Sequence, residues 1–210
     1  MKREISKNLK IILLGILVFL LLIISFLLFR ELRHSSFTES KKVLYNYKTE
    51  TNIEYEVNFK PNILYDTPTL GEGNVYITEY VDDINATFIF EFNGERTSEI
   101  KGDYEIIGIM EGFTGEGEKY KKLWTKNYVF LPKVEFDSQD QQIAFNEKVT
   151  IHLDTYEDFI EVFKKETKRM SQARLALFMN INLVVNTDEG LIEKKFSPNI
   201  AFPLDVGYFQ

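Results

Sequence analysis

The stretch YNYKTETNIEYEVNF, residues 45–59, alternates between apolar and polar side chains without a break. Every odd position holds Tyr, Thr, Ile, Val or Phe, and every even position holds Asn, Lys or Glu. Successive side chains of a strand point to opposite faces of a sheet, so this period of two predicts a β-strand with one buried face. Fifteen such residues extend about 50 Å, which is long for one strand. We therefore expect a bend or bulge near residues 49–52.

An uncharged apolar run precedes this strand. Residues 11–29 read IILLGILVFLLLIISFLLF. A helix of that length spans roughly 28 Å, close to the thickness of a bilayer's hydrocarbon core. We therefore predict a transmembrane helix that contacts membrane lipid through residues 11–29. A cleaved signal peptide is the alternative, but its apolar region is shorter and ends at small residues, whereas FRELRHSSF follows here.

Charge is distributed unevenly along the chain. Residues 1–44 hold eight Lys or Arg and three Glu, so that with a total net charge of −7 the remaining residues carry −12. An acidic body of this size repels phosphates, and we expect no nucleic-acid partner. The four basic residues before the span favour a cytoplasmic tail at residues 1–10. Residues 30–44 are then a polar stalk, and residues 45–210 form a domain outside the cell membrane.

Further strand signals fill this outer domain. Residues 84–93 alternate and end at an Asn93–Gly94 turn signal, and residues 173–185 place apolar side chains at seven consecutive odd positions. Apolar runs at residues 100–110, 123–131 and 143–153 predict additional strands. Gly102 and Gly108, inside one of these runs, indicate a bulge or a close approach of another chain segment.

One amphipathic helix interrupts the strands. It is predicted at about residues 155–170, with an apolar stripe that suits a cover over the end of a sheet. Residues 111–122 are expected to form a mobile loop because Gly, Glu and Lys dominate them. The whole pattern is typical of an all-β fold, an antiparallel immunoglobulin-like β-sandwich with one helix.

Two short segments share one motif. FKPNILY occupies residues 59–65, and FSPNIAF occupies residues 196–202. Proline has no N–H to donate to a strand ladder, so each copy predicts a strand end or an edge. Either the domain contains two related halves, or the two segments match by coincidence.

The order of several motifs resembles a known family. After the single N-terminal span come YEVNFKPNILY at residues 55–65, YITEYVDDINATFIFEF at residues 76–92, and Trp124. Together they are similar to the DUF5305 family, over roughly residues 10–205. The resemblance implies a membrane-anchored protein of bacteria or archaea. Members often carry a second, C-terminal span, so we expect this chain to be a shorter or a truncated member. The family has no established activity, and it implies topology but no catalytic residues.

Residues able to support catalysis or metal binding are few. The chain has no cysteine, which excludes disulfides, thiolate nucleophiles and Cys-based zinc sites. His34 falls in the stalk and His152 on the polar side of a strand, so neither is expected in a catalytic triad. The acidic groups are Asp82 with Asp83, Glu111 with Glu116 and Glu118, and Asp137 with Asp140, and none fits a calcium-loop pattern. We predict no catalytic, cofactor-binding or metal-binding residues, and calcium binding by the acidic loops stays open.

The tyrosines of the opening strand allow two interpretations. Tyr45, Tyr47 and Tyr55 share one face. Such a row can stack on sugars or form a sticky interface, but it is more often the half-buried face of a sandwich whose phenol oxygens reach the rim. We expect the structural interpretation.

The leading functional hypothesis is a non-enzymatic, single-pass envelope protein that binds or assembles with a protein partner. It would act through sheet edges and through loops such as residues 111–122. One alternative is a carboxylate-dependent cell-surface glycan hydrolase, because the separation of two carboxylates is not visible in a sequence. Another is an accessory subunit that acts through its transmembrane helix, although Gly15 and Ser25 are not spaced as a packing motif.

Overall fold

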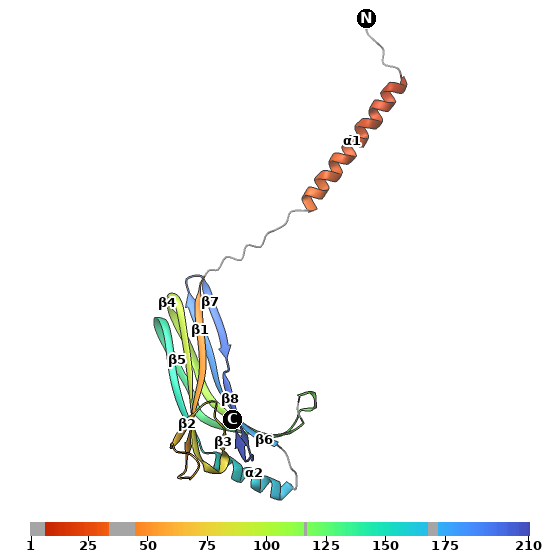
Figure 1. The fold of residues 1–210 in the computed structure, drawn as a ribbon. Helices are drawn as coiled ribbons and strands as arrows, with labels where there is room; N and C mark the ends of the chain where they lie inside the picture. Colours follow the sequence, from red (N-terminus) through yellow and green to blue (C-terminus); the bar gives the residue numbers. More distant parts are fainter. Residues whose placement is uncertain (1–6, 34–44, 116, 168–171) are drawn as a thin grey trace. The chain divides into compact units, whose positions relative to one another are not determined.

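Two units make up the described part of the chain, and Figure 1 shows both. The computed structural model describes residues 7–33, 45–115, 117–167 and 172–210. The first unit contains helix α1 (Lys7–Arg33), and the second is a β-rich body. The predicted tail and stalk lie outside the described residues, except for their parts that belong to α1.

Helix α1 is apolar and exposed. The stretch Lys10–Arg30 is long and apolar enough to cross a membrane, and none of it is buried. The helix extends past the predicted residues 11–29 at both ends, where Lys, Arg, Glu and Leu are good helix formers. Its length and composition fit a membrane anchor, and they also fit a signal sequence near the N-terminus.

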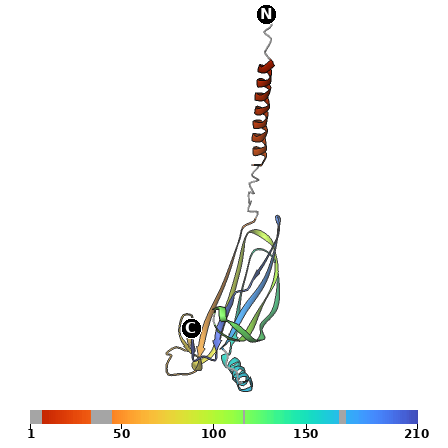
Figure 2. The same ribbon diagram turned by 90° about the vertical axis from the view of Figure 1, so that its right-hand side faces the viewer.

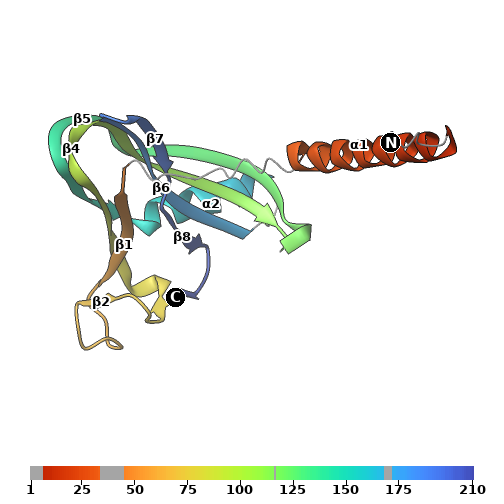
Figure 3. The same cartoon turned by 90° about the horizontal axis from the view of Figure 1, so that it is seen from above.

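A long β-hairpin that changes its partner halfway forms the body. Strands β4 (Val81–Thr114) and β5 (Lys121–Ile151) pair antiparallel along their lengths. The other edge of β4 pairs first with β1 (Tyr47–Phe59) and then with β6 (Gln172–Thr187). The change of partner coincides with a shift in the β4–β5 register between Asn93 and Ser98. The sheet bends there, and Figure 3 shows β4 and β5 curving together from the side of β1 to the side of β6.

Shorter elements complete the body. They are β2 (Thr69–Gly71), β3 (Tyr76–Ile77), the 3₁₀ helices η1 (Thr78–Tyr80) and η2 (Gly117–Lys119), α2 (Leu153–Thr167), β7 (Gly190–Phe196), β8 (Asn199–Leu204) and β9 (Tyr208–Phe209). β2 extends β1, β7 and β8 extend β6, and β3 pairs with β9. All these pairings are antiparallel, which confirms the mostly β antiparallel prediction. The immunoglobulin-like sandwich is not confirmed, since β1, β2 and β4–β8 form one continuous sheet.

Three local predictions are wrong. Asn93–Gly94 is not a hairpin turn but lies inside β4, because β5 pairs with β4 on both sides of this point. Strand β1 has no bend at residues 49–52, and its pairing with β4 stays in register until a shift between Asn58 and Phe59. The expected loop at residues 111–122 is shorter than predicted, since β4 continues to Thr114 and β5 begins at Lys121.

The two prolines of the shared motif follow strand ends, as predicted. β1 ends at Phe59 before Pro61, and β7 ends at Phe196 before Pro198. Beyond the prolines the segments differ. In the first copy the Asn62 side chain accepts hydrogen bonds from backbone N–H groups in a turn, whereas the second copy continues directly into strand β8.

The core lies between the two halves of the bent sheet. Phe90 of the first half and Tyr104 of the second half both contact the Phe145 ring, with centroid distances of 4.9 and 4.3 Å. Phe90 also contacts Phe196 of β7 at 5.4 Å. The predicted alternation in β6 is confirmed, because all seven apolar odd positions from Ala173 to Val185 are buried. Each fully buried large side chain stabilises the fold by about 1.5–3 kcal/mol.

Helix α2 closes the core at the end of the body opposite the bend, as Figure 2 shows. Its residues Tyr156 and Ile160 are buried, and the Trp124 ring of β5 contacts Phe163 at 5.1 Å. The Trp124 indole lies flat on the backbone of Gly112, where an added Cβ would stand 2.1 Å from Nε1. The helix begins two residues before the predicted start, and residues 168–170 of the prediction lie outside the described residues. We call this end the α2 end, and the opposite end, around residues 94–98, the bend end.

Candidate functional site

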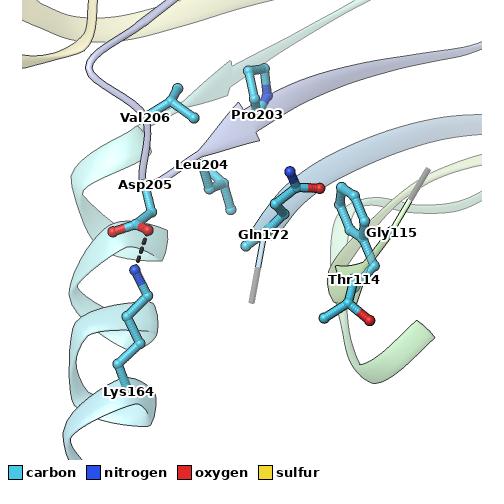
Figure 4. Close-up of a pocket in the computed structure, with 10 residues that line it drawn as sticks. Thr114, Gly115, Lys164, Gln172, Pro203, Leu204, Asp205 and Val206 are labelled. Carbon is cyan, nitrogen blue, oxygen red and sulfur yellow. Dashed lines mark hydrogen bonds and ion pairs between the residues drawn. The ribbon is translucent and has the colours of Figure 1, made fainter. Parts of the chain in front are cut away.

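A pocket of about 610 Å³ opens at the α2 end (Figure 4). Four segments line it: the end of β4, the start of β6, the end of β8 with the turn after it, and α2. Phe113, Pro203, Leu204 and Val206 supply much of its apolar surface. Ligand pockets are commonly apolar cavities with a few placed polar groups, and this pocket has that composition.

An ion pair between α2 and the turn after β8 forms one side of the pocket. The Lys164 ammonium binds the Asp205 carboxylate, and Figure 4 shows both side chains at the pocket wall. Asp205 has a φ of 61°, in the left-handed region that few residues other than Gly, Asn and Asp adopt. The ion pair thus holds a conformationally costly turn at the rim of the pocket.

A buried carboxylate lies two residues before Phe113, one of the residues that line the pocket. Glu111 of β4 is only 7% exposed, and it lies directly across from Arg174 of β6 in the sheet register. The Arg174 Nε donates to Glu111 Oε1 at 2.6 Å, and the Tyr120 hydroxyl donates to the same oxygen at 3.0 Å. The Arg174 guanidinium also lies over the Phe113 ring, 5.2 Å from its centroid. This cluster orders the end of the β4–β5 hairpin and orients Phe113 toward the pocket region, where a mobile loop had been expected.

The other acidic residues that the sequence suggested do not form a site. Asp83 lies in β4 and accepts hydrogen bonds from the Asn58 and Asn85 side chains at 2.6 and 3.1 Å. Asp137 lies in β5, 3.4 Å from the Lys101 ammonium. Asp82 and Asp140 are likewise strand residues rather than loop residues. Asp137 lines a separate pocket with Asp103 and Glu135, and Asp82, Asp83 and Asp140 do not line it.

The side chains of three residues considered in the sequence analysis cannot be placed. Glu116 and the Glu118 side chain lie outside the described residues, as does His34. His152 is exposed directly before α2, not within a strand. Within the described residues, no group of three or more His, Cys, Asp and Glu side chains is arranged to hold a metal ion.

The three tyrosines of the opening stretch, two of them in β1, pack against the core. Tyr45, Tyr47 and Tyr55 are partly buried against the core, which supports the core interpretation. Tyr47 stacks on Phe92 at 5.7 Å, and Tyr55 meets Phe202 of β8 edge-on at 5.6 Å. Burial, together with a hydrogen bond to Tyr76, raises the pKa of Tyr55 to about 12.

Sequence reasoning did not find Lys164 and Asp205. Lys164 was one of several lysines near the end of a predicted helix, and nothing local separates it from the others. Asp205 stands two residues before Gly207, and Asp and Gly are typical of turns. That signal could have located the turn, but it does not show which helix packs against it.

Comparison with known proteins gives one family. The model of DUF5305, described as a family of unknown function, matches residues 124–210. No curated protein matches the chain.

Two solved structures resemble the chain only weakly. A Bordetella pertussis protein assigned as ApaA is 7% identical, with a TM-score of 0.27, and the match covers 77% of this chain and 95% of that one. A protein from Archaeoglobus fulgidus is 6% identical, also with a TM-score of 0.27, and the match covers 77% of this chain and 98% of that one. Scores this low support no statement about fold or function. The family match over residues 124–210 confirms, for this part of the chain, the predicted resemblance to the DUF5305 family.

Proposed function

We propose that this protein is a single-pass membrane protein that presents its acidic β body outside the cell for binding or assembly, without catalysis. Residues 11–29 would anchor it in the lipid, with a cytoplasmic N-terminus on the basis of the positive-inside bias. The body would act as a rigid, immunoglobulin-like sandwich, since the two halves of its bent sheet pack face to face.

The pocket at the α2 end is the observation that carries this proposal. It combines about 610 Å³ of space, a largely apolar lining and one ion pair at its rim. Its walls are the ends of three strands and one helix, which hold the lining residues in place. A rigid concave surface of this kind suits recognition of a protruding apolar group on a partner.

The free edge of β1 offers a second contact surface. The Tyr55 N–H donates to the Glu72 side chain, so the odd residues of β1 direct their backbone groups away from β4. The Ile53 N–H is bound by the Asn52 side chain, whereas Tyr47, Thr49 and Thr51 have no strand partner on that side among the described residues. A partner strand could therefore pair with residues 47–51, which supports the assembly role.

Site-specific photocrosslinking in the native membrane tests the proposal. A photoreactive amino acid is placed in the full chain at Thr114 on the pocket rim, at Thr51 on the β1 edge, and at exposed Lys148 on β5 as a matched control. We expect a discrete protein adduct from Thr114, with or without one from Thr51, and none from Lys148. Equal labelling at all three positions, or no adduct at any of them, would contradict a binding role.

Replacing the apolar span at residues 11–29 distinguishes the proposed binding role of the β body from an accessory subunit that acts through its transmembrane helix. The crosslinking is repeated after residues 11–29 are exchanged for an unrelated apolar span. Persistence of the Thr114 adduct is expected, because the proposed contact belongs to the β body. Loss of the adduct would favour the accessory subunit that acts through its transmembrane helix, and release of soluble saccharide from envelope glycan by the purified chain would favour the hydrolase.

A further inference from the structure

A second pocket, of about 590 Å³, lies on the other side of Asp205 and Val206, which line both pockets. Residues from η1, from α2 and from the turn after β8 surround it. Five of its nine lining residues carry carboxylates: Glu79, Glu157, Asp158, Glu161 and Asp205. The apolar pocket and this acidic pocket are therefore neighbours divided by one turn.

Only part of this negative charge is compensated within the protein. Asp205 is paired with Lys164, and Glu161 is paired with Lys165 at 2.6 Å. Among the described residues, Glu79, Glu157 and Asp158 form no ion pair. Charges of one sign that line a concave surface attract ions of the opposite sign from solution.

A buried hydroxyl in the same pocket lacks a hydrogen-bond partner. Thr78 lines the acidic pocket and is only 9% exposed, and its Oγ1 has no partner within the described structure. The backbone N–H of Thr78 is already bound to the Gly207 carbonyl at 3.2 Å. Buried hydroxyls in folded proteins are nearly always hydrogen-bonded, so this oxygen is available to accept a donor from a ligand.

The raised pKa of Glu157 agrees with a site that favours an added positive charge. Burial raises its pKa, and the negative charges of Asp205 and Asp154 raise it further. The Asp205 backbone N–H and the Lys60 ammonium act in the opposite direction without cancelling the effect. A cation placed in the pocket would stabilise the ionised carboxylate of Glu157 and so lower its pKa.

An organic cation fits the pocket better than a metal ion. No three acidic or histidine side chains of the described residues are arranged around a common point that could hold a metal. The carboxylates instead surround a space that an extended ammonium or guanidinium side chain can enter, with several separate acceptors for its N–H donors.

We propose that the two pockets together bind a polypeptide segment of a partner in which a Lys or Arg stands next to a large apolar residue. The basic side chain enters the acidic pocket toward Asp158, Glu157 and Thr78, and the apolar side chain enters the pocket lined by Phe113 and Leu204. This inference rests on the proposed binding role of the α2 end and specifies the chemistry of its partner.

Peptide binding to the full chain in detergent tests the inference. Three dye-labelled peptides of equal length are compared by fluorescence anisotropy: one with two arginines followed by two leucines, one with glutamates in place of the arginines, and one with serines in place of the leucines. We expect the first peptide to bind at least tenfold more tightly than either of the others.

Matched variants locate the site. Asp158→Asn with Glu161→Gln removes two exposed charges from the acidic pocket and should weaken the first peptide about tenfold. Glu166→Gln changes the charge of the same helix at an exposed position that lines neither pocket, and should leave binding unchanged. Thr78→Val removes the unpaired hydroxyl while keeping the side-chain shape, and should weaken the arginine peptide but not the folded state.

Different results would refute the basic, apolar partner and the binding role of the α2 end. If the glutamate peptide binds as tightly as the arginine peptide, and a Val206→Asn variant weakens both, the basic partner is refuted while a binding role for this end stands. If none of the peptides binds and the Thr114 crosslink is also absent, the binding role itself is refuted. An equal loss in the Glu166→Gln control would show general charge attraction and overturn the assignment to the pocket.

Discussion

Stacked rings pack the core near the bend end of the β body, whereas the apolar and the acidic pocket both lie at the α2 end. At the bend end, Phe90, Tyr104 and Phe145 form contacts of 4.3–4.9 Å between the halves of the sheet. At the α2 end, Asp205 has a positive φ and the Thr78 hydroxyl is buried without a partner. Strained and unsatisfied groups persist where the surrounding structure supports them, and they concentrate at functional sites. This difference agrees with the proposal that the α2 end binds a partner, and it assigns to the bend end mainly a role in stability.

Removing a ring from the bend end should have the largest effect. Phe90 is fully buried, and Phe90→Ala is expected to lower the free energy of unfolding by about 3–5 kcal/mol, through lost apolar contacts and the cavity left behind. Denaturant unfolding of the full chain in detergent measures it. Val129→Ala, at a position that is 70% exposed, is the control and should change stability by less than about 0.5 kcal/mol. Similar losses for the two variants would contradict the assignment of stability to this end.

Removing the charge of Glu111 should have an intermediate effect. In Glu111→Gln the buried pair with Arg174 is broken, at a cost of about 1–3 kcal/mol, because Arg174 is partly exposed and water can solvate it. The hairpin end near Tyr120 should also become more sensitive to protease, since the hydrogen bond from this tyrosine is weakened. Glu50→Gln, which removes an exposed pair with Lys48, should change stability little and leave cleavage unchanged, because water screens exposed ion pairs. Unchanged cleavage in both variants would mean that the cluster does not order the hairpin end.

Alkaline pH should weaken the bend end through Tyr104. Burial and the hydrogen bond to Glu147 raise the pKa of Tyr104 from 10.0 to about 12. In the unfolded chain this phenol ionises at its ordinary pKa, while in the folded protein it stays protonated, so stability is full below pH 10 and falls as the pH rises toward 12. Melting temperatures measured from pH 8 to about pH 12 should show this decline, and Tyr104→Phe should reduce its slope. Tyr55 contributes a similar decline and remains in the variant, so a slope that does not change at all would contradict the assignment to Tyr104.

The sequence predicted what short-range patterns determine. The alternation in β1 and β6 and the apolar stripe of α2 come from neighbouring residues, and the structure contains all three elements. The Asn93–Gly94 signal failed because pairing with long strands on both sides outweighs a local turn preference. The pockets could not be predicted, since their walls come from segments far apart in the sequence, within residues 113–206 in one pocket and 77–207 in the other, that strand pairing and helix packing bring together.

Glu157→Gln should have the smallest effect on the melting temperature, and it should stabilise the folded protein where the other substitutions destabilise it. The raised pKa of Glu157 means that the folded state disfavours its ionised form. Glu157→Gln should therefore slightly raise the melting temperature at pH 7. As the pH falls below the ordinary pKa of Glu, the carboxyl group is protonated in both the folded and the unfolded state, and the gain should vanish. Scans at pH 7 and at about pH 4 compare the two chains, with Glu166→Gln as the control. If Glu157→Gln stabilises the protein while Phe90→Ala destabilises it, the α2 end retains a charge that lowers stability. A site for a basic ligand would retain such a charge. A variant less stable than the parent at pH 7 would remove that support.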